Sequence, residues 1–269
     1  MNVKVIVLRT AGTNCNEETA FAFTRSGGSV EQVHVNALIE GTKKLGDYHI
    51  LALPGGFSYG DDIASGRILA NELRLKLGED LKQFIRDGKL IIGICNGFQI
   101  LAKAGILPGL EYGLTPVENQ RGKQEATLFY NDSAKFEARW VHLKTEGRSV
   151  WTKDIKSVIY LPVAHGEGKF IPRDAKVMEA LAANGQIVFR YCTEDRGKPV
   201  YPENPNGSTD DIAGICDTTG RVLGLMPHPE RHFLFEQHPY WTRLAKKTVF
   251  GDGAKIFENG INYVKEHLL

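Results

Sequence analysis

Short apolar runs alternate with helix-like stretches through the first hundred positions of the chain. The runs occupy residues 3–8, 30–35, 49–53 and 90–94. Each has the length of a strand, and a continuous apolar run is typical of a strand buried on both faces, as in a parallel sheet. Between the runs, the spacing of apolar positions predicts helices over residues 16–25, 63–77 and 79–86. This alternation predicts an α/β fold with a mostly parallel central sheet flanked by helices.

The pattern changes after residue 107. Residues 126–130 and 138–144 alternate between apolar and polar positions, as antiparallel strands do, so we expect a small antiparallel β insertion over about 108–160. Further strands are predicted at 158–163 and 186–191, with a helix over 175–183 between them, and 212–216 and 222–226 predict a hairpin. A helical tail is expected over about 240–269. All 269 residues are expected to form a single domain.

The run at 90–94 leads directly into a motif that could carry out chemistry. Cys95 follows it, with Gly93 two positions before the cysteine and Gly97 two positions after, and a helical pattern comes next. Strand, Gly-x-Cys-x-Gly and helix form the thiol version of a nucleophile elbow, in which the glycines avoid a steric clash at a tight turn. A helix N-terminus also favours thiolate over thiol. The alternative is a small buried cysteine at a strand end.

A cysteine nucleophile needs a base, and the base needs a group that orients it. His228, Pro229 and Glu230 follow the second strand of the predicted hairpin. Proline favours an extended chain, in which side chains two positions apart point to the same side. Glu230 could therefore bind one ring nitrogen of His228 while the other faces the thiol. The alternative is that His228 is only a polar loop residue between two prolines.

A glycine pair follows the strand at 49–53. Gly55 and Gly56 lack side chains, so their backbone N–H groups can lie beside a reacting carbonyl and, with the N–H of Asn96, form an oxyanion hole. The loop is not a phosphate loop, because no Gly-Lys-Ser/Thr follows at the required spacing. A tight turn without further function is the alternative.

Composition excludes several classes of function. The chain has 33 basic and 32 acidic residues, without a basic run suited to nucleic acid. No stretch reaches the length of a membrane span and the N-terminus does not resemble a signal peptide, so we expect a cytoplasmic protein without a membrane partner. The four cysteines lack the spacing of a metal site, so neither a metal nor a disulfide is expected. Cys15 is interpreted as a helix-start residue, and Cys192 and Cys216 as structural residues.

Together these motifs resemble class I, triad-type, glutamine amidotransferases. Within that family they are similar to the glutaminase components of phosphoribosylformylglycinamidine synthases, which act in purine biosynthesis. The resemblance covers most of the chain up to about residue 233, and the segments that carry it are 54–61, 93–99, 136–141, 164–168, 204–208 and 227–231. Residues 118–124 match no strong motif.

The resemblance implies a mechanism for glutamine hydrolysis. Cys95 would attack the side-chain amide of glutamine, and the N–H groups of Gly56 and Asn96 would hold the oxyanion. His228, oriented by Glu230, would protonate the departing ammonia, and water would then hydrolyse the glutamyl thioester.

By the same resemblance, Gly55, Phe57 and Gln99 belong to the oxyanion and substrate region. Ammonia would pass to a separate ATP-dependent synthetase, which would hold ATP and Mg²⁺, while this chain would carry no cofactor. The synthetase is expected either as a short form with a small bridging subunit or as one large polypeptide. Candidates for the partner interface, in the loops around 165 and 194–211 and the segment 136–141, are His165, Glu167, Arg139 and Asn206. Two alternatives remain, namely a glutaminase subunit of another amidotransferase and a cysteine hydrolase on the same fold.

Overall fold

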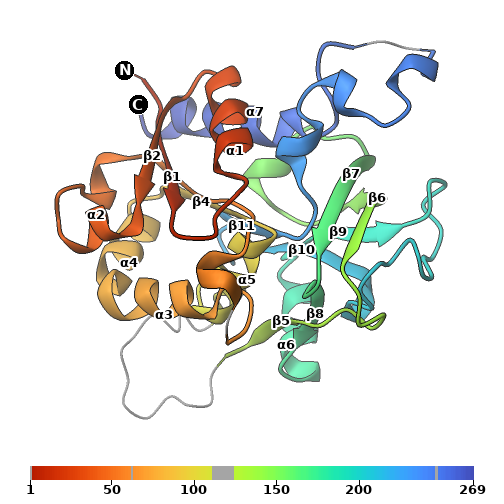
Figure 1. Cartoon of the computed structure of the whole chain (residues 1–269), viewed down its shortest axis with the longest axis horizontal. Helices are drawn as coiled ribbons and strands as arrows, with labels where there is room; N and C mark the ends of the chain where they lie inside the picture. The colour runs from red at the N-terminus through yellow and green to blue at the C-terminus, as the bar shows by residue number, and fades with distance from the viewer. Residues whose placement is uncertain (1, 62, 111–123, 246–247) are drawn as a thin grey trace.

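A nine-stranded sheet forms the centre of the molecule, with the strand order β2-β1-β3-β4-β11-β10-β9-β6-β7. The computed structural model describes residues 2–61, 63–110, 124–245 and 248–269 (Figure 1). The parallel half of the sheet contains β1 (Lys4–Arg9), β2 (Ser29–His34), β3 (Ile50–Leu53), β4 (Leu90–Ile94) and β11 (Val222–Leu225). The antiparallel half contains β10 (Ile212–Cys216), β9 (Ile187–Cys192), β6 (Glu137–Thr145) and β7 (Val158–His165).

Helices cover both faces of the parallel half. Figure 1 shows α1 and α7 together on one side of the sheet and α3, α4 and α5 on the other. The α-helices are α1 (Asn16–Arg25), α2 (Val35–Ile39), α3 (Arg67–Lys76), α4 (Gly78–Arg86), α5 (Asn96–Lys103), α6 (Ala175–Ala183) and α7 (Ala254–His267). Short 3-10 helices are η1 (Leu45–Asp47), η2 (Ser58–Asp61), η3 (Val150–Thr152), η4 (Thr209–Asp211), η5 (Pro229–His232), η6 (Phe235–Gln237) and η7 (Trp241–Arg243). The predicted α/β class is confirmed.

Burial explains why the central strands carry unbroken apolar runs. All residues of β3, β4 and β11 are buried, because helices lie on both sides of them. On one face, Phe23 of α1 meets Phe257 of α7 with their ring centroids 5.0 Å apart in an edge-to-face arrangement. None of the helices in the described ranges is long and apolar enough to span a membrane.

The strands expected in one β insertion belong to two different sheets. β5 (Ala126–Phe129) pairs with β8 (Lys169–Pro172), forming a separate antiparallel pair. β6 instead pairs with β7 and β9 and extends the main sheet. β6 buries Val141 and Leu143 within that sheet, so it gains more from the main sheet than from β5. The small antiparallel sheet therefore consists of β5 and β8, while the stretch 138–144 belongs to the main sheet. Residues 111–123 of the expected insertion, with most of the 118–124 segment, lie outside the described residues.

Smaller differences concern the ends of the elements. The helix expected over 63–77 begins only at Arg67, and the tail contains the helices η7 and α7. The helix α2 and the strand β8 were not predicted, because each is only four or five residues long and too short to show a period.

Candidate active site

Cys95 stands at the turn between β4 and α5. Its backbone has φ 51° and ψ −103°, a conformation that side-chain-bearing residues rarely adopt. Its N–H donates to the carbonyl oxygen of Leu225 at 2.8 Å, which fixes the turn against β11. A Cβ added at Gly97 would lie 1.9 Å from the carbonyl oxygen of Leu53, and one added at Gly93 would lie 2.6 Å from that of Gly97. The predicted elbow is therefore confirmed, and both glycines are required by close backbone contacts.

His228 reaches the same edge of the sheet because β11 lies beside β4. The two strands are parallel, with Leu225 opposite Ile94, so their carboxyl ends meet at one place. The His228 N–H donates to the carbonyl oxygen of Pro162 on β7 at 2.8 Å. The Nδ1 atom of His228 lies 2.6 Å from Oε1 of Glu230. The expected extended tripeptide is wrong, since η5 begins at Pro229, but the first turn of this helix still brings the carboxylate to the ring.

The charge state of His228 follows from its neighbours. Burial disfavours the charged ring, but the carboxylate of Glu230, a negative charge on Cys95 and a hydrogen bond with the Cys15 thiol together raise the pKa of His228 well above its usual value. The Nε2 atom is buried and makes no hydrogen bond to the residues that the structure describes. The thiolate is the form of a cysteine that acts as a nucleophile.

The loop that contains Gly55 and Gly56 lies against Cys95 and His228. A Cβ added at Gly55 would lie 2.7 Å from Cε1 of His228 and 3.5 Å from Cβ of Cys95. Gly56 has φ 144°, and a side chain there would meet the backbone nitrogen of Asn14 at 2.7 Å. Asn96 is the first residue of α5, where backbone N–H groups have no partner within the helix. The structure thus brings Gly55 beside Cys95 and His228, with Gly56 next to it in the loop and Asn96 next to Cys95 in the chain.

Phe57 and Gln99 occupy different surroundings. Phe57 is 44% exposed and its ring lies 6.3 Å from that of Phe136, so it faces outward. Gln99 is buried, accepts from Nδ2 of Asn96 at 2.9 Å and donates to the carbonyl oxygen of Glu167 at 2.5 Å. Both ends of the Gln99 amide are therefore used within the protein. This geometry gives Gln99 a part in positioning α5.

Cys15 lies closer to the site than the sequence suggested. Its Sγ atom is 4.0 Å from Nδ1 of His228, and Nη2 of Arg231 donates to it at 3.0 Å. Burial raises the pKa of the Cys15 thiol. The only signal in the sequence was its place in the loop after the first strand, at the ligand-facing edge of such sheets.

One group in the described chain has the spacing of metal ligands. The ligand atoms of Cys15, His228 and Glu230 all lie within 4.8 Å of one another. However, Nδ1 of His228 already binds Glu230, and the guanidinium of Arg231 contacts the sulfur. A cation would have to displace the contact between His228 and Glu230 and approach the positive charge of Arg231. This arrangement therefore suits proton transfer better than metal binding.

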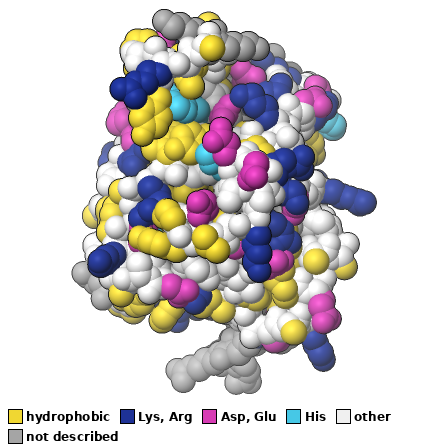
Figure 2. Space-filling model, turned by 90° about the vertical axis from the view of Figure 1, so that its right-hand side faces the viewer, with side chains coloured by type: hydrophobic (Ala, Val, Ile, Leu, Met, Phe, Trp, Pro, Cys, Tyr) yellow, Lys and Arg dark blue, Asp and Glu magenta, His cyan; other side chains and the backbone are white. Residues whose placement is uncertain are grey.

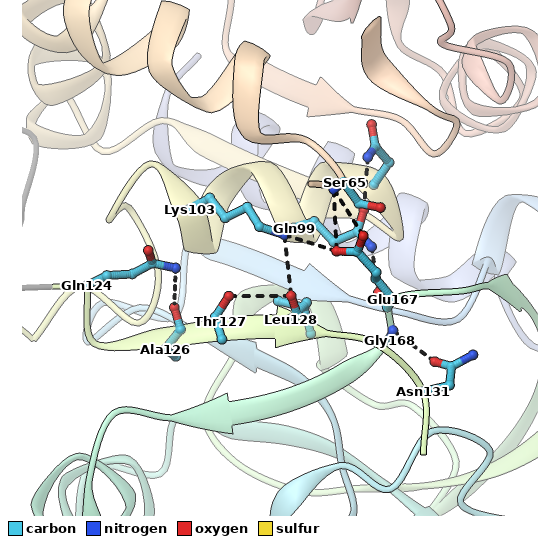
Figure 3. A network of polar contacts seen from close by, with 11 residues as sticks. Ser65, Gln99, Lys103, Gln124, Ala126, Thr127, Leu128, Asn131, Glu167 and Gly168 are labelled. Atoms are coloured by element: carbon cyan, nitrogen blue, oxygen red, sulfur yellow. Dashed lines mark hydrogen bonds and ion pairs between the residues drawn. The ribbon is translucent and has the colours of Figure 1, made fainter. Parts of the chain in front are cut away.

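Three of the four residues expected at a partner interface are buried. His165, Glu167 and Asn206 are 2%, 8% and 0% exposed. Glu167 accepts from the Ser65 N–H at 3.3 Å and lies 3.6 Å from Nζ of Lys103, as Figure 3 shows. Internal hydrogen bonds hold these three side chains inside the protein, and their place at a partner interface stays a prediction.

Arg139 alone of the four lies at the surface. It pairs with Glu137 and donates to the Tyr201 hydroxyl at 3.2 Å, and its guanidinium lies over the Tyr201 ring at 5.1 Å. On the face shown in Figure 2, Lys and Arg are interspersed with Asp and Glu. The drawn residues of that face therefore produce no extended field of one sign.

A thiol on an elbow, a His–Glu pair at the adjacent strand end and a glycine loop define a class of α/β proteins that gather these groups at the carboxyl ends of their central strands. The particular family follows from a family model, described as the CobB/CobQ-like glutamine amidotransferase domain, that matches residues 2–264. The chain belongs to this glutamine amidotransferase family, as its motifs indicated.

Individual relatives agree with this assignment. A phosphoribosylformylglycinamidine synthase subunit PurQ from Dehalococcoides mccartyi is 45% identical over 266 residues, covering 98% of this chain and 98% of its own length. The subunit of the same name from Methanococcus maripaludis is 44% identical and covers 97% of each chain. A chain of the PurLQS structure from Thermotoga maritima is 31% identical, with a TM-score of 0.73, and covers 98% of this chain and 100% of its own.

Proposed function

We propose that this chain is the glutaminase subunit of a phosphoribosylformylglycinamidine synthase, which hydrolyses glutamine and supplies ammonia for purine biosynthesis. The observation that carries the proposal is similarity to the named PurQ subunits along nearly the whole of both chains. Such similarity favours this synthase over another amidotransferase or a cysteine hydrolase with the same fold. The arrangement of Cys95, His228 and Glu230 supports the chemistry that the activity needs.

The proposed reaction has two halves that use the same residues. The Cys95 thiolate attacks the side-chain carbonyl carbon of glutamine, and the N–H groups of Gly56 and Asn96 stabilise the oxyanion. His228 gives its proton to the amide nitrogen, the C–N bond breaks, and ammonia leaves a glutamyl thioester. Water then attacks the thioester while His228 takes its proton, and the S–C bond breaks to release glutamate. Glu230 holds the ring in position throughout.

The partner in this proposal is an ATP-dependent synthetase that holds ATP and Mg²⁺, while this chain holds no cofactor. The PurLQS structure, in which one chain resembles this protein, supports a synthetase together with a small bridging subunit. The nucleophile must be a free thiol, and all four cysteines are free. We therefore place the reaction in the reducing cytoplasm.

The test is glutamate release from glutamine, measured for the chain alone and with its synthetase subunits. A glutamine-mimicking alkylator should label one cysteine, Cys95, and Cys95→Ala should abolish both labelling and turnover. Cys192→Ala, at a buried cysteine at the end of β9, is the matched control and should change neither. Equal turnover of asparagine, or labelling that survives Cys95→Ala, would contradict the proposal.

A further inference from the structure

The side chain of His165 is a buried group that the proposed reaction does not use. It lies at the end of β7 and is 2% exposed. Its Nε2 atom is buried and makes no hydrogen bond with any residue in the described parts of the chain. A buried polar atom without a hydrogen-bond partner destabilises a protein. The unpaired Nε2 atom therefore points to a ligand that forms the missing hydrogen bond.

The hydrogen bonds around Asn131 determine which ring nitrogen of His165 carries the proton. Nδ2 of Asn131 donates to the carbonyl oxygens of Lys135 at 2.9 Å and of His165 at 2.8 Å. Oδ1 of Asn131 is therefore the acceptor, and it receives the Gly168 N–H at 3.0 Å (Figure 3). The same oxygen lies 3.1 Å from Nδ1 of His165, so Nδ1 must donate. Nε2 consequently presents a lone pair and can only accept a hydrogen bond.

The ring keeps this form at neutral pH. Burial, assisted by the positive charge of His228, lowers the pKa of His165 to about 3. His165 therefore stays neutral near the imidazolium of His228. Two neighbouring histidines thus have opposite charge states, one suited to donating a proton and the other suited only to accepting a hydrogen bond.

Several contacts place the segment that carries His165 near the thiol. The carbonyl oxygen of Ala164, the preceding residue, lies 3.7 Å from Sγ of Cys95. Burial raises the pKa of the Tyr191 hydroxyl, and the charge of Cys95 raises it further, which places this phenol near the thiol. Nδ2 of Asn206 donates to that hydroxyl at 3.0 Å. A Cβ on Gly168 would lie 2.8 Å from the same nitrogen and 2.4 Å from the His165 ring, so the ring lies beside this group.

We infer that Nε2 of His165 accepts a hydrogen bond from the nitrogen of the glutamine side-chain amide, the atom that leaves as ammonia. This inference rests on the proposed function. The amide nitrogen carries N–H donors before, during and after cleavage of the C–N bond. A neutral acceptor can hold the departing ammonia without protonating it, whereas an acidic group would convert it to ammonium. The carboxylate of glutamate has no N–H, so His165 would favour substrate over product.

The experiment compares two γ-glutamyl substrates in the assembled synthase. Glutamine and the γ-methyl ester of glutamate form the same thioester at Cys95, but the ester loses methanol and has no N–H on its leaving group. His165→Phe should lower kcat/KM about tenfold for glutamine, the effect of one hydrogen bond, and less than twofold for the ester. His165→Gln, which keeps an acceptor, should restore part of the loss with glutamine.

A second variant separates this role from support of the loop. Ser208 accepts the Phe170 N–H at 2.9 Å and contacts the carbonyl oxygen of Gly168 without touching the ring. Ser208→Ala should therefore affect both substrates equally. An equal loss for both substrates in His165→Phe, or no loss for glutamine, would overturn the inference alone. A wild-type synthase that hydrolyses neither substrate would overturn the proposed function first, and the inference with it.

Discussion

A single methyl group added at Gly97 is expected to separate the loop of Gly55 and Gly56 from the turn that carries Cys95. Gly97 lies in the first turn of α5 and packs against Leu53, the last residue of β3. Gly55 and Gly56 follow Leu53 by two and three positions. A side chain at position 97 would therefore push the glycine loop away from the turn that carries Cys95.

The size of this movement follows from the contact distance. A Cβ at position 97 would lie 1.9 Å from the carbonyl oxygen of Leu53, and real Cβ atoms essentially never come within 3.0 Å of a neighbour, so the backbones must separate by at least about 1.1 Å. Overpacking of this kind lowers the free energy of unfolding by about 1–3 kcal/mol. A displacement of about 1 Å between reacting groups lowers the rate by about 100-fold.

Denaturant unfolding and glutamine turnover of Gly97→Ala measure the two effects. Gly46→Ala is the matched control, since a Cβ at Gly46 meets nothing within 4 Å. We expect the control to stay within 1 kcal/mol and twofold of the wild type. If Gly97→Ala behaved like this control, the close contact with Leu53 would not be what maintains the site, and the steric argument for the elbow would be refuted.

Three further predictions concern charged and polar groups. Glu230→Gln should lower kcat/KM about 100-fold. The folded pKa of His228 is raised, so the stability that its charged ring contributes to the folded protein is complete below pH 6.5 and is lost as the pH rises through the folded value. The free energy of unfolding should therefore decline less above pH 6.5 in Glu230→Gln than in the wild type. His165 has a depressed folded pKa, so the loss of stability between pH 6.5 and 5, measured by denaturation at both pH values, should be roughly 1.5 kcal/mol larger in the wild type than in His165→Gln. Lys103→Met leaves Glu167 buried without this cation and should lower the free energy of unfolding by about 3 kcal/mol, part of which Lys103→Met with Glu167→Gln should recover; an unchanged denaturation midpoint in the single variant would contradict this.

The parts of the site that were predictable depend on local sequence. The elbow requires particular residues within a few positions of Cys95, and the histidine and glutamate are two positions apart. Strand periodicity also placed both motifs at strand ends. These features left a signal because neighbouring residues alone create them.

The parts that could not be predicted depend on contacts between distant segments. His165 and Asn206 have polar side chains in loops, so exposure was the natural expectation, yet partners on other loops and strands bury them. Cys15 reaches the site only because the loop after β1 folds against Gly55. β5 finds its partner in β8, more than forty residues further along the chain. Pattern alone does not identify such partners.

The position of β11 has a consequence for how the protein is made. β2, β1, β3 and β4 come from the first 94 residues, and β4 remains an open edge until residues 222–225 pair with it. During synthesis this wholly apolar strand, Leu90–Ile94, keeps one edge unpaired until most of the remaining chain has been made. Such an edge invites aggregation, and its late closure slows folding. The same pairing brings His228 to the end of β4, so in a nascent chain His228 reaches Cys95 only when the open edge of β4 is covered.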